Sequence, residues 1–270
     1  MPYTIDMAQR ACATLYRASL FFVLSACGQA NDSQNTRATA EKHMIELTYP
    51  ANAAQADVKH CIIWLHGLGA TADDFPPIVP HLGLDTTRPI RFIFPQAPDR
   101  PITINGGFVM PGWHDIKGLD LASKEDREGM EESRATVEQI ISTQLDLGIE
   151  ADKIILAGFS QGGAVTYYTG TRTEHKLAGL LTLSTYLVFL EATAGEQSDA
   201  NQSTPIFASH GTQDPVVPIE LGELSVKTLQ GLGYDITWET YPMQHEVSLP
   251  QIQAIGHWIN TVFEAQTESR

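Results

Sequence analysis

The sequence predicts one α/β domain built on a mostly parallel β-sheet with helices on both faces. From Met44 onward, short apolar segments alternate with longer segments of helical periodicity, which is the pattern of β-α-β units. Several of the apolar segments are almost continuously hydrophobic, as strands covered on both faces should be. The chain has 270 residues, of which 43% are hydrophobic and 18% charged, so it can bury the core of a single large domain.

The predicted strands are short and are separated by helices or turns. They cover residues 45–49, 61–65, 91–94, 153–157, 177–183, 205–209 and 236–241. The main helices are predicted over residues 126–147, 162–169, 219–232 and 249–263. The first of these has apolar residues at helical spacing and ends at Gly148. Residues 191–204 are polar and are expected to form a loop, and no inserted block is large enough for a separate lid domain.

The first 43 residues have the composition of an export signal followed by a tether. Basic residues precede a short apolar run, which ends in Leu24-Ser25-Ala26-Cys27 and resembles the lipobox of bacterial lipoproteins. The run is too short for a membrane-spanning helix. We therefore expect residues 1–26 to be a lipoprotein-type signal peptide, Cys27 to be lipidated, residues 27–43 to be a flexible polar tether and residues 44–270 to be the folded α/β domain. This predicts a bacterial cell envelope lipoprotein; translation from Met44 would instead give a cytoplasmic protein.

The charge and the cysteines exclude several classes of function. The formal net charge is −15 with only 17 Lys and Arg, which argues against nucleic acid or an anionic membrane surface as an electrostatic partner. The three cysteines, Cys12, Cys27 and Cys61, have no metal-ligand spacing, so neither a metal site nor a disulfide framework is indicated. Cys61 falls in an apolar strand and is expected to be a buried thiol.

Ser160 lies in Gly158-Phe159-Ser160-Gln161-Gly162, directly after a predicted strand and before a predicted helix. Small residues two positions before and after a serine let the backbone turn so tightly that the hydroxyl projects at the top of the sheet. A Cβ at either glycine would collide with the neighbouring strand or helix. Most Gly-X-Ser-X-Gly sequences are ordinary turns, but the position between a strand and a helix predicts that Ser160 is a nucleophile.

A serine nucleophile needs a base within hydrogen-bond reach and a carboxylate that orients the base. In α/β-hydrolase sheets these residues follow in the order serine, acid, histidine, each in a loop after a strand. Asp214 lies in a turn rich in glycine and proline after the strand at 205–209, and His245 follows the last predicted strand. Alone, Asp214 could cap a helix and His245 could be an ordinary loop histidine. Their order and placement predict a catalytic triad with Ser160.

Nine histidines compete for the role of base. His66 and His210 each begin a His-Gly pair at a strand end, where an imidazole is expected to brace a loop. His114 lies in a loop that could line the pocket and is the main rival of His245. The others precede strands, fall on helices or lie in a polar connection: His43, His60, His81, His175 and His257.

The tetrahedral intermediate of acyl transfer needs hydrogen-bond donors for its oxyanion, each worth about 3 to 4 kcal/mol. The backbone N–H of Gln161 is expected to be one donor, because this residue follows the nucleophile at the start of a helix. Leu68 is expected to supply the other, since Gly67 and Gly69 let the backbone turn its amides toward the site. The alternative for this segment is a simple glycine-rich turn.

Together these residues resemble the acyl-protein thioesterase and type 2 carboxylesterase family, also labelled phospholipase/carboxylesterase, of the α/β-hydrolase fold. The matching stretches are residues 64–69, 95–98, 103–107, 113–116, 158–164, 214–218 and 243–245. Each is modest alone, but their order and spacing are specific. One departure is Gln244, which stands where the family usually has a glycine before the histidine, and another is the amino-terminal leader.

The resemblance implies a compact α/β hydrolase without a large lid, acting on carboxylic esters or thioesters and needing no cofactor. Carried over to the matching positions, it gives Ser160 as nucleophile, His245 as base, Asp214 as orienting acid, Leu68 and Gln161 as oxyanion donors, and Trp113, Gly107 and Phe108 as part of the acyl-pocket wall.

The sequence therefore predicts a serine carboxylesterase that cleaves a small-molecule or lipid ester through an acyl-enzyme. A lysophospholipase or acyl-protein thioesterase acting on longer acyl chains is the alternative within the same class. A catalytically inactive, envelope-anchored binding protein is the alternative from another class, and it would be expected to lack at least one residue of the triad. All three residues are present.

Overall fold

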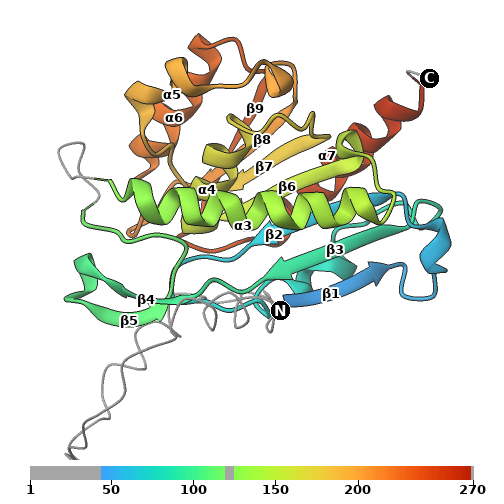
Figure 1. Ribbon diagram of the computed structural model, residues 1–270, viewed down its shortest axis with the longest axis horizontal. Helices are drawn as coiled ribbons and strands as arrows, with labels where there is room; N and C mark the ends of the chain where they lie inside the picture. Colours follow the sequence, from blue (N-terminus) through green and yellow to red (C-terminus); the bar gives the residue numbers. More distant parts are fainter. Residues whose placement is uncertain (1–43, 119–124, 269–270) are drawn as a thin grey trace, which may run out of the picture.

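The computed structural model describes residues 44–118 and 125–268 (Figure 1). The predicted signal peptide, the predicted lipidation site Cys27 and the predicted tether lie outside the described residues. Within the described part of the chain, no helix is both long and apolar enough to cross a membrane.

The core of the structure is a seven-stranded sheet with the strand order β1-β3-β2-β6-β7-β8-β9. The strands are β1 (Met44–Tyr49), β2 (His60–Leu65), β3 (Ile90–Pro95), β6 (Ile154–Phe159), β7 (Gly179–Leu183), β8 (Ile206–Gly211) and β9 (Ile236–Tyr241). The edge strand β1 pairs antiparallel with β3, and every other pairing in this sheet is parallel. The predicted α/β class and mostly parallel sheet are confirmed, and each predicted strand is present with small shifts at its ends.

The continuous apolar runs divide their side chains between two cores, one on each face of the sheet. In β2, Cys61, Ile63 and Leu65 face one core and Ile62 and Trp64 face the other. The first core is completed by residues of α3 (Arg127–Asp146), α4 (Gln161–Gly170) and α6 (Ile219–Gly231). The second is completed by α7 (Leu249–Glu268) and the short 3-10 helix Pro76–His81. Both faces are therefore covered, which explains why these strands lack polar alternation.

The ends of the longest helix on the first face follow from local sequence. Asp126 caps α3 by accepting a hydrogen bond from the N–H of Gly129 at 3.3 Å. Gly148 closes the same helix with φ 84°, a left-handed conformation that glycine adopts without strain. In Figure 1 α3 and α4 lie in front of the strands, and the two helices contact each other on this face of the sheet.

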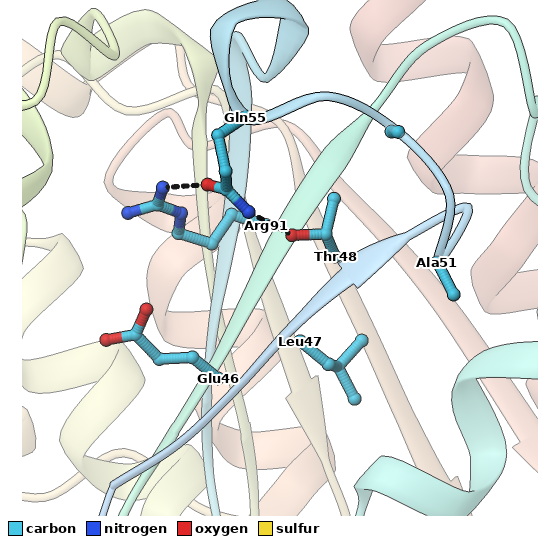
Figure 2. Close-up of a pocket in the computed structure, with 7 residues that line it drawn as sticks. Glu46, Leu47, Thr48, Ala51, Gln55 and Arg91 are labelled. Atoms are coloured by element: carbon cyan, nitrogen blue, oxygen red, sulfur yellow. Dashed lines mark hydrogen bonds between the residues drawn. The ribbon is translucent and has the colours of Figure 1, made fainter.

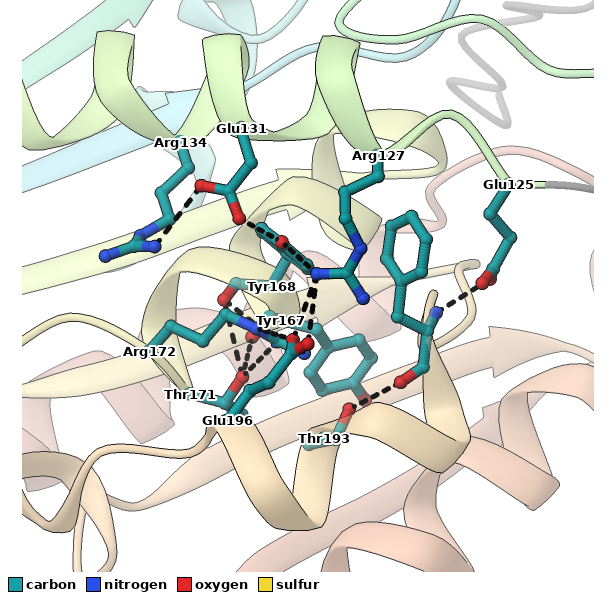
Figure 3. A network of polar contacts seen from close by, with 11 residues as sticks. Glu125, Arg127, Glu131, Arg134, Tyr167, Tyr168, Thr171, Arg172, Thr193 and Glu196 are labelled. Atoms are coloured by element: carbon teal, nitrogen blue, oxygen red, sulfur yellow. Dashed lines mark hydrogen bonds and ion pairs between the residues drawn. The ribbon is translucent and has the colours of Figure 1, made fainter.

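Two regions differ from the sequence-based prediction. The prediction of a loop over residues 191–204 is wrong, because α5 (Leu190–Glu196) and the 3-10 helix Asp199–Asn201 form there. A seven-residue helix is too short to show a clear helical periodicity in the sequence. It is also bonded to a distant segment, because Arg172 donates two hydrogen bonds to Glu196 (Figure 3).

The second difference is a hairpin of β4 (Asp99–Ile102) and β5 (Phe108–Pro111), which forms a separate two-stranded sheet. Pro101 and Pro111 obscured both strands in the sequence, since proline is tolerated only at special strand positions.

A shallow hollow lies over β1 and the start of β3 (Figure 2). Arg91 donates to Gln55 at 2.6 Å, and Gln55 donates to Thr48 at 3.1 Å. Its lining residues are Glu46, Leu47, Thr48, Ala51, Ala53, Gln55 and Arg91. Arg91 is near the amino end of β3, whereas Ser160 follows the carboxyl end of the parallel strand β6. The hollow and the serine therefore lie at opposite ends of the strands.

Candidate active site

Ser160 occupies a strained turn between β6 and α4. Its φ of 53° and ψ of −120° are unusual for a residue other than glycine. A Cβ on Gly158 would lie 2.3 Å from the main chain of Gly162, and one on Gly162 would lie 2.4 Å from the carbonyl oxygen of Leu65. Glycine is therefore required at both positions, for the reason expected from the sequence.

The structure brings Ser160, His245 and Asp214 together from three separate loops. Ser160 Oγ lies 2.9 Å from His245 Nε2, and His245 Nδ1 lies 2.7 Å from Asp214 Oδ2. Because a carboxylate accepts hydrogen bonds, the imidazole donates from Nδ1 to Asp214 and leaves Nε2 free to accept from the serine hydroxyl. This is the hydrogen-bond chain that a serine hydrolase requires.

The carboxylate of Asp214 is fully buried and held on both oxygens. Oδ1 accepts from the N–H groups of Val216 at 2.8 Å and Val217 at 2.9 Å. Burial alone would raise the pKa of Asp214, but hydrogen bonds from His210 and His245 outweigh it and hold the pKa well below its usual value. Asp214 is thus ionised throughout the neutral range and keeps His245 in one tautomer.

His210 is a part of this site that the sequence indicated only as a loop brace. Its ring is fully buried, and its Nε2 donates to the carbonyl of Val217 at 2.9 Å while lying 3.4 Å from Asp214 Oδ2. The ring therefore supports both the acid and the turn that carries it. The His-Gly pair at the end of β8 was the only signal for this contact.

The predicted oxyanion donors both have free main-chain N–H groups. Neither the N–H of Leu68 nor that of Gln161 donates to any group in the described part of the chain. Gln161 is the first residue of α4, where amides point out of the helix toward an anion. A Cβ on Gly67 would lie 3.4 Å from Ser160 Cβ, so the Leu68 segment passes directly beside the serine.

The side chain of Gln161 makes contacts that no pattern in the sequence indicated. Its amide is buried, with Oε1 accepting from the N–H of Trp113 at 2.8 Å and Nε2 donating to the carbonyl of His114 at 2.7 Å. The residue after the serine therefore clamps the segment 113–114 against the start of α4. Trp113 and Gln161 are 48 residues apart in the chain, so no local sequence pattern predicts this contact.

The residues predicted for the acyl-pocket wall lie in two different environments. Trp113 is buried, and its Nε1 donates to the carbonyl of His66 at 2.9 Å. Phe108 is 52% exposed at the start of β5, after the turn in which Gly106 and Gly107 have positive φ. The structure does not bring Phe108 and Gly107 into contact with the triad, and their role in substrate binding stays a prediction.

The rival base His114 is engaged elsewhere. Its ring is buried, with Nδ1 3.0 Å from the carbonyl of Asp115, and burial lowers its pKa to about 4. It makes no hydrogen bond to Ser160 in the described structure, whereas His245 does. The arrangement thus favours His245 as the base.

Comparisons with known proteins agree with this geometry. Residues 51–263 match the family model described as Phospholipase/Carboxylesterase. Acyl-protein thioesterase 1 of Gibberella zeae is 39% identical over 213 residues, which cover 76% of this chain and 89% of the relative. Acyl-protein thioesterase 1 of Neurospora crassa is 38% identical over 212 residues, which cover 73% and 84%.

Solved structures give the same result. Arabidopsis thaliana SOBER1 has a TM-score of 0.72 at 28% identity, covering 76% of this chain and 99% of that one. Zea mays acyl-protein thioesterase 2 has a TM-score of 0.71 at 25% identity, covering 81% and 98%. The chain therefore belongs to the phospholipase/carboxylesterase family of α/β hydrolases, whose members cleave esters and thioesters.

Proposed function

We propose that the protein is a serine carboxylesterase in which Ser160 attacks the ester carbonyl. The observation that carries this proposal is the position of the His245 imidazole, 2.9 Å from Ser160 Oγ and 2.7 Å from Asp214 Oδ2. His245 takes the hydroxyl proton during the attack and gives it to the departing alcohol, which leaves an acyl-enzyme. Water then attacks the acyl-enzyme with the same base and releases the acid.

A negative charge develops on the carbonyl oxygen during the attack. We assign its stabilisation to hydrogen bonds from the N–H groups of Leu68 and Gln161. Two observations support the assignment: both groups lack an acceptor in the described structure, and Gln161 N–H stands at the amino end of α4. Asp214 remains ionised and stabilises the imidazolium as it forms.

A second candidate function is hydrolysis of longer acyl chains, as in a lysophospholipase or an acyl-protein thioesterase. The names of the fungal relatives favour it. The hairpin that carries the predicted acyl-pocket residues also exposes Ile104, Phe108 and Val109, which are 47%, 52% and 57% exposed. Such apolar side chains could contact a long acyl chain.

Chain-length profiling separates the two candidates. Turnover of p-nitrophenyl esters and of matched thioesters from C2 to C16 would be measured with wild-type protein and with Ser160→Ala. A sharp preference for short soluble esters supports the carboxylesterase and counts against the lipid function, whereas a rise toward long chains or thioesters reverses this conclusion. Turnover retained by Ser160→Ala would show that the nucleophile is misassigned. Failure of a fluorophosphonate to label Ser160, together with absence of turnover, would refute both candidates and revive the inactive binding protein.

We also propose, from the sequence pattern of residues 1–43, that the chain is exported and anchored through Cys27. Removal of residues 1–26 and lipidation of Cys27 would leave residues 27–43 as a tether to the hydrolase domain at 44–270. Mass spectrometry of the natural amino terminus tests this: a diacylated Cys27 is expected, and a chain that starts at Met44 would overturn the proposal.

A further inference from the structure

His66 is a buried histidine beside the candidate site that the proposed reaction leaves unused. It directly follows β2, its exposed fraction is 2%, and both ring nitrogens have partners. Nδ1 lies 2.8 Å from the carbonyl oxygen of Gly67, and Nε2 lies 3.0 Å from the main-chain nitrogen of Ala97.

The partners fix the tautomer of this ring. The main-chain N–H of Ala97 can only donate, so Nε2 of His66 must accept and carries no hydrogen. The hydrogen is then on Nδ1, which donates to the carbonyl of Gly67. Burial lowers the pKa of His66 to about 4, so the ring stays neutral and keeps this tautomer at physiological pH.

The carbonyl that His66 holds belongs to the same peptide unit as the N–H of Leu68. A trans peptide is planar, and its C=O and N–H point in opposite directions. Fixing the oxygen of Gly67 therefore fixes the direction of the Leu68 N–H. This peptide passes beside the nucleophile, since a Cβ on Gly67 would lie 3.4 Å from Ser160 Cβ.

Other contacts of this loop leave the Leu68 N–H free. Ala70 N–H also donates to the Gly67 oxygen at 3.2 Å, and Gly69 N–H donates to Pro111 at 2.8 Å. Leu68 N–H has no acceptor in the described part of the chain. If the peptide flipped, a carbonyl oxygen would take the place of this donor and would repel the charge that develops on the substrate.

We propose that His66 is a positioning residue of the oxyanion hole, holding the Gly67–Leu68 peptide so that the Leu68 N–H faces the carbonyl attacked by Ser160. The inference rests on the proposed function, because it assigns His66 to that same reaction. His66 touches no reacting atom and acts only through the peptide.

A matched pair of variants isolates the Nδ1 donor. In His66→Asn the side-chain nitrogen takes the place of Nδ1 and can still donate to Gly67, whereas His66→Leu has a similar shape and no donor. Both lose the acceptor for Ala97. We expect kcat for a p-nitrophenyl ester to fall about 10- to 100-fold in His66→Leu, with KM changed less than about threefold, and to stay within about fivefold of wild type in His66→Asn.

A trifluoromethyl ketone provides a readout that a purely structural role would not move. Its adduct with the serine carries an oxyanion, so its affinity for His66→Leu should fall by the same factor as kcat/KM. His114→Asn is the control, because His114 is equally buried and also bonds the carbonyl of the following residue. It should lose stability but keep kcat. Equal kcat in His66→Leu and His66→Asn, or a His66→Leu variant that loses stability alone, would overturn the proposal.

A measurement on the wild-type protein covers the case in which His66→Leu does not fold. Nitrogen-15 NMR of the histidine rings should show the His66 hydrogen on Nδ1 between pH 7 and pH 5, and a hydrogen on Nε2 would overturn the proposal. Failure of the proposed function is a separate result, because it would appear as turnover by Ser160→Ala whatever the His66 variants do.

Discussion

The Oγ1 of Thr185 donates a hydrogen bond to the carbonyl oxygen of Ser160 at 2.6 Å. Thr185 is buried just after β7, and the same carbonyl also accepts from Ala164 N–H in the first turn of α4 at 3.1 Å. The strained turn is thus tied to the neighbouring strand as well as to its own helix. A residue 25 positions away helps to hold the serine in its unusual conformation.

Replacing the Thr185 hydroxyl by a methyl group keeps the shape of the side chain and tests this hydrogen bond. Thr185→Val should lower the free energy of unfolding by about 1 to 2 kcal/mol, because one buried hydrogen bond is lost. It should also lower kcat by about fivefold, since the serine is less well oriented. Thr185→Ser keeps the hydroxyl and should retain activity. Urea unfolding and ester turnover measure both effects, and a Val variant with wild-type values would contradict the prediction.

The clamp formed by the Gln161 side chain predicts a loss of stability. Gln161→Ala keeps the main-chain N–H but leaves the N–H of Trp113 and the carbonyl of His114 buried without their partner. We expect the free energy of unfolding to fall by about 2 to 4 kcal/mol. Gln230→Ala on the exposed face of α6 is the control and should stay within about 0.5 kcal/mol. Equal stabilities of the two variants in urea would disprove the clamp.

The ion pair that supports α5 should show strong coupling (Figure 3). Arg172 is 3% exposed, lies 4.0 Å from the centre of the Tyr168 ring and bonds Glu196 at 2.8 Å. A double-mutant cycle with Arg172→Met and Glu196→Ala should give a coupling free energy of about 1 to 3 kcal/mol, because Glu196→Ala alone leaves a buried guanidinium unpaired.

The control cycle uses Arg134 and Glu131, whose side chains are 31% and 46% exposed. That pair is screened by water and should couple by less than about 1 kcal/mol. Chemical unfolding of the four proteins in each cycle gives both values. A coupling for Arg172 and Glu196 no larger than that of the control would show that the pair does not hold α5.

Glycine at position 162 should be irreplaceable, whereas glycine at 195 should not. A Cβ on Gly162 would lie 2.4 Å from Leu65 O and 2.6 Å from His66 O, so Gly162→Ala should lower the free energy of unfolding by about 3 kcal/mol or more and abolish activity. Gly195 lies in α5 with open space around it, and Gly195→Ala should gain up to about 1 kcal/mol. Thermal unfolding distinguishes the two, and a stable, active Gly162→Ala would refute the steric argument.

Stability should fall as the pH drops from about 6.5 toward 4. Burial lowers the pKa of His66 and His114 to about 4, so the folded protein keeps both rings neutral while the unfolded chain takes up protons near pH 6.5. Above about pH 6.5 neither state binds these protons and the free energy of unfolding has its full value. Between pH 7 and pH 5, proton uptake by the unfolded chain should lower the free energy of unfolding by about 2 kcal/mol for each ring.

Urea unfolding at pH 7 and pH 5 measures this loss. His114→Gln should reduce the difference between the two pH values by about 2 kcal/mol. His257→Gln, at an exposed position of α7, is the matched control for the substitution itself. If His114→Gln showed the same pH dependence as wild type, the protonation of that ring would not be the cause.

The sequence was sufficient to predict the fold and the three side chains that meet above the sheet. Strands such as β6 are apolar on both faces, which predicts a sheet covered on both sides. Glycine is required at positions 158 and 162 for steric reasons, and this requirement can be inferred without coordinates. The order of Ser160, Asp214 and His245 along the chain also follows from the topology of a parallel sheet, because each residue comes after the carboxyl end of a strand.

What the sequence did not predict depends on contacts between distant segments. The helix α5 is bonded through Glu196 to Arg172, and the hairpin β4–β5 contains prolines that suppress the usual strand pattern. The side-chain role of Gln161 and the contact of His210 with Asp214 depend on where loops lie in space. Local periodicity contains no information about such distances.

The strand order determines when, during folding, the proposed catalytic centre can assemble. Ser160 and His245 are 85 residues apart, and the strands that precede them, β6 and β9, are separated in the sheet by β7 and β8. Loops of that length close slowly, and parallel strands cannot pair until their crossovers have formed. A partly assembled chain therefore has Ser160 without His245, its proposed base, and the recovery of ester turnover during renaturation would report the completion of the sheet rather than its beginning.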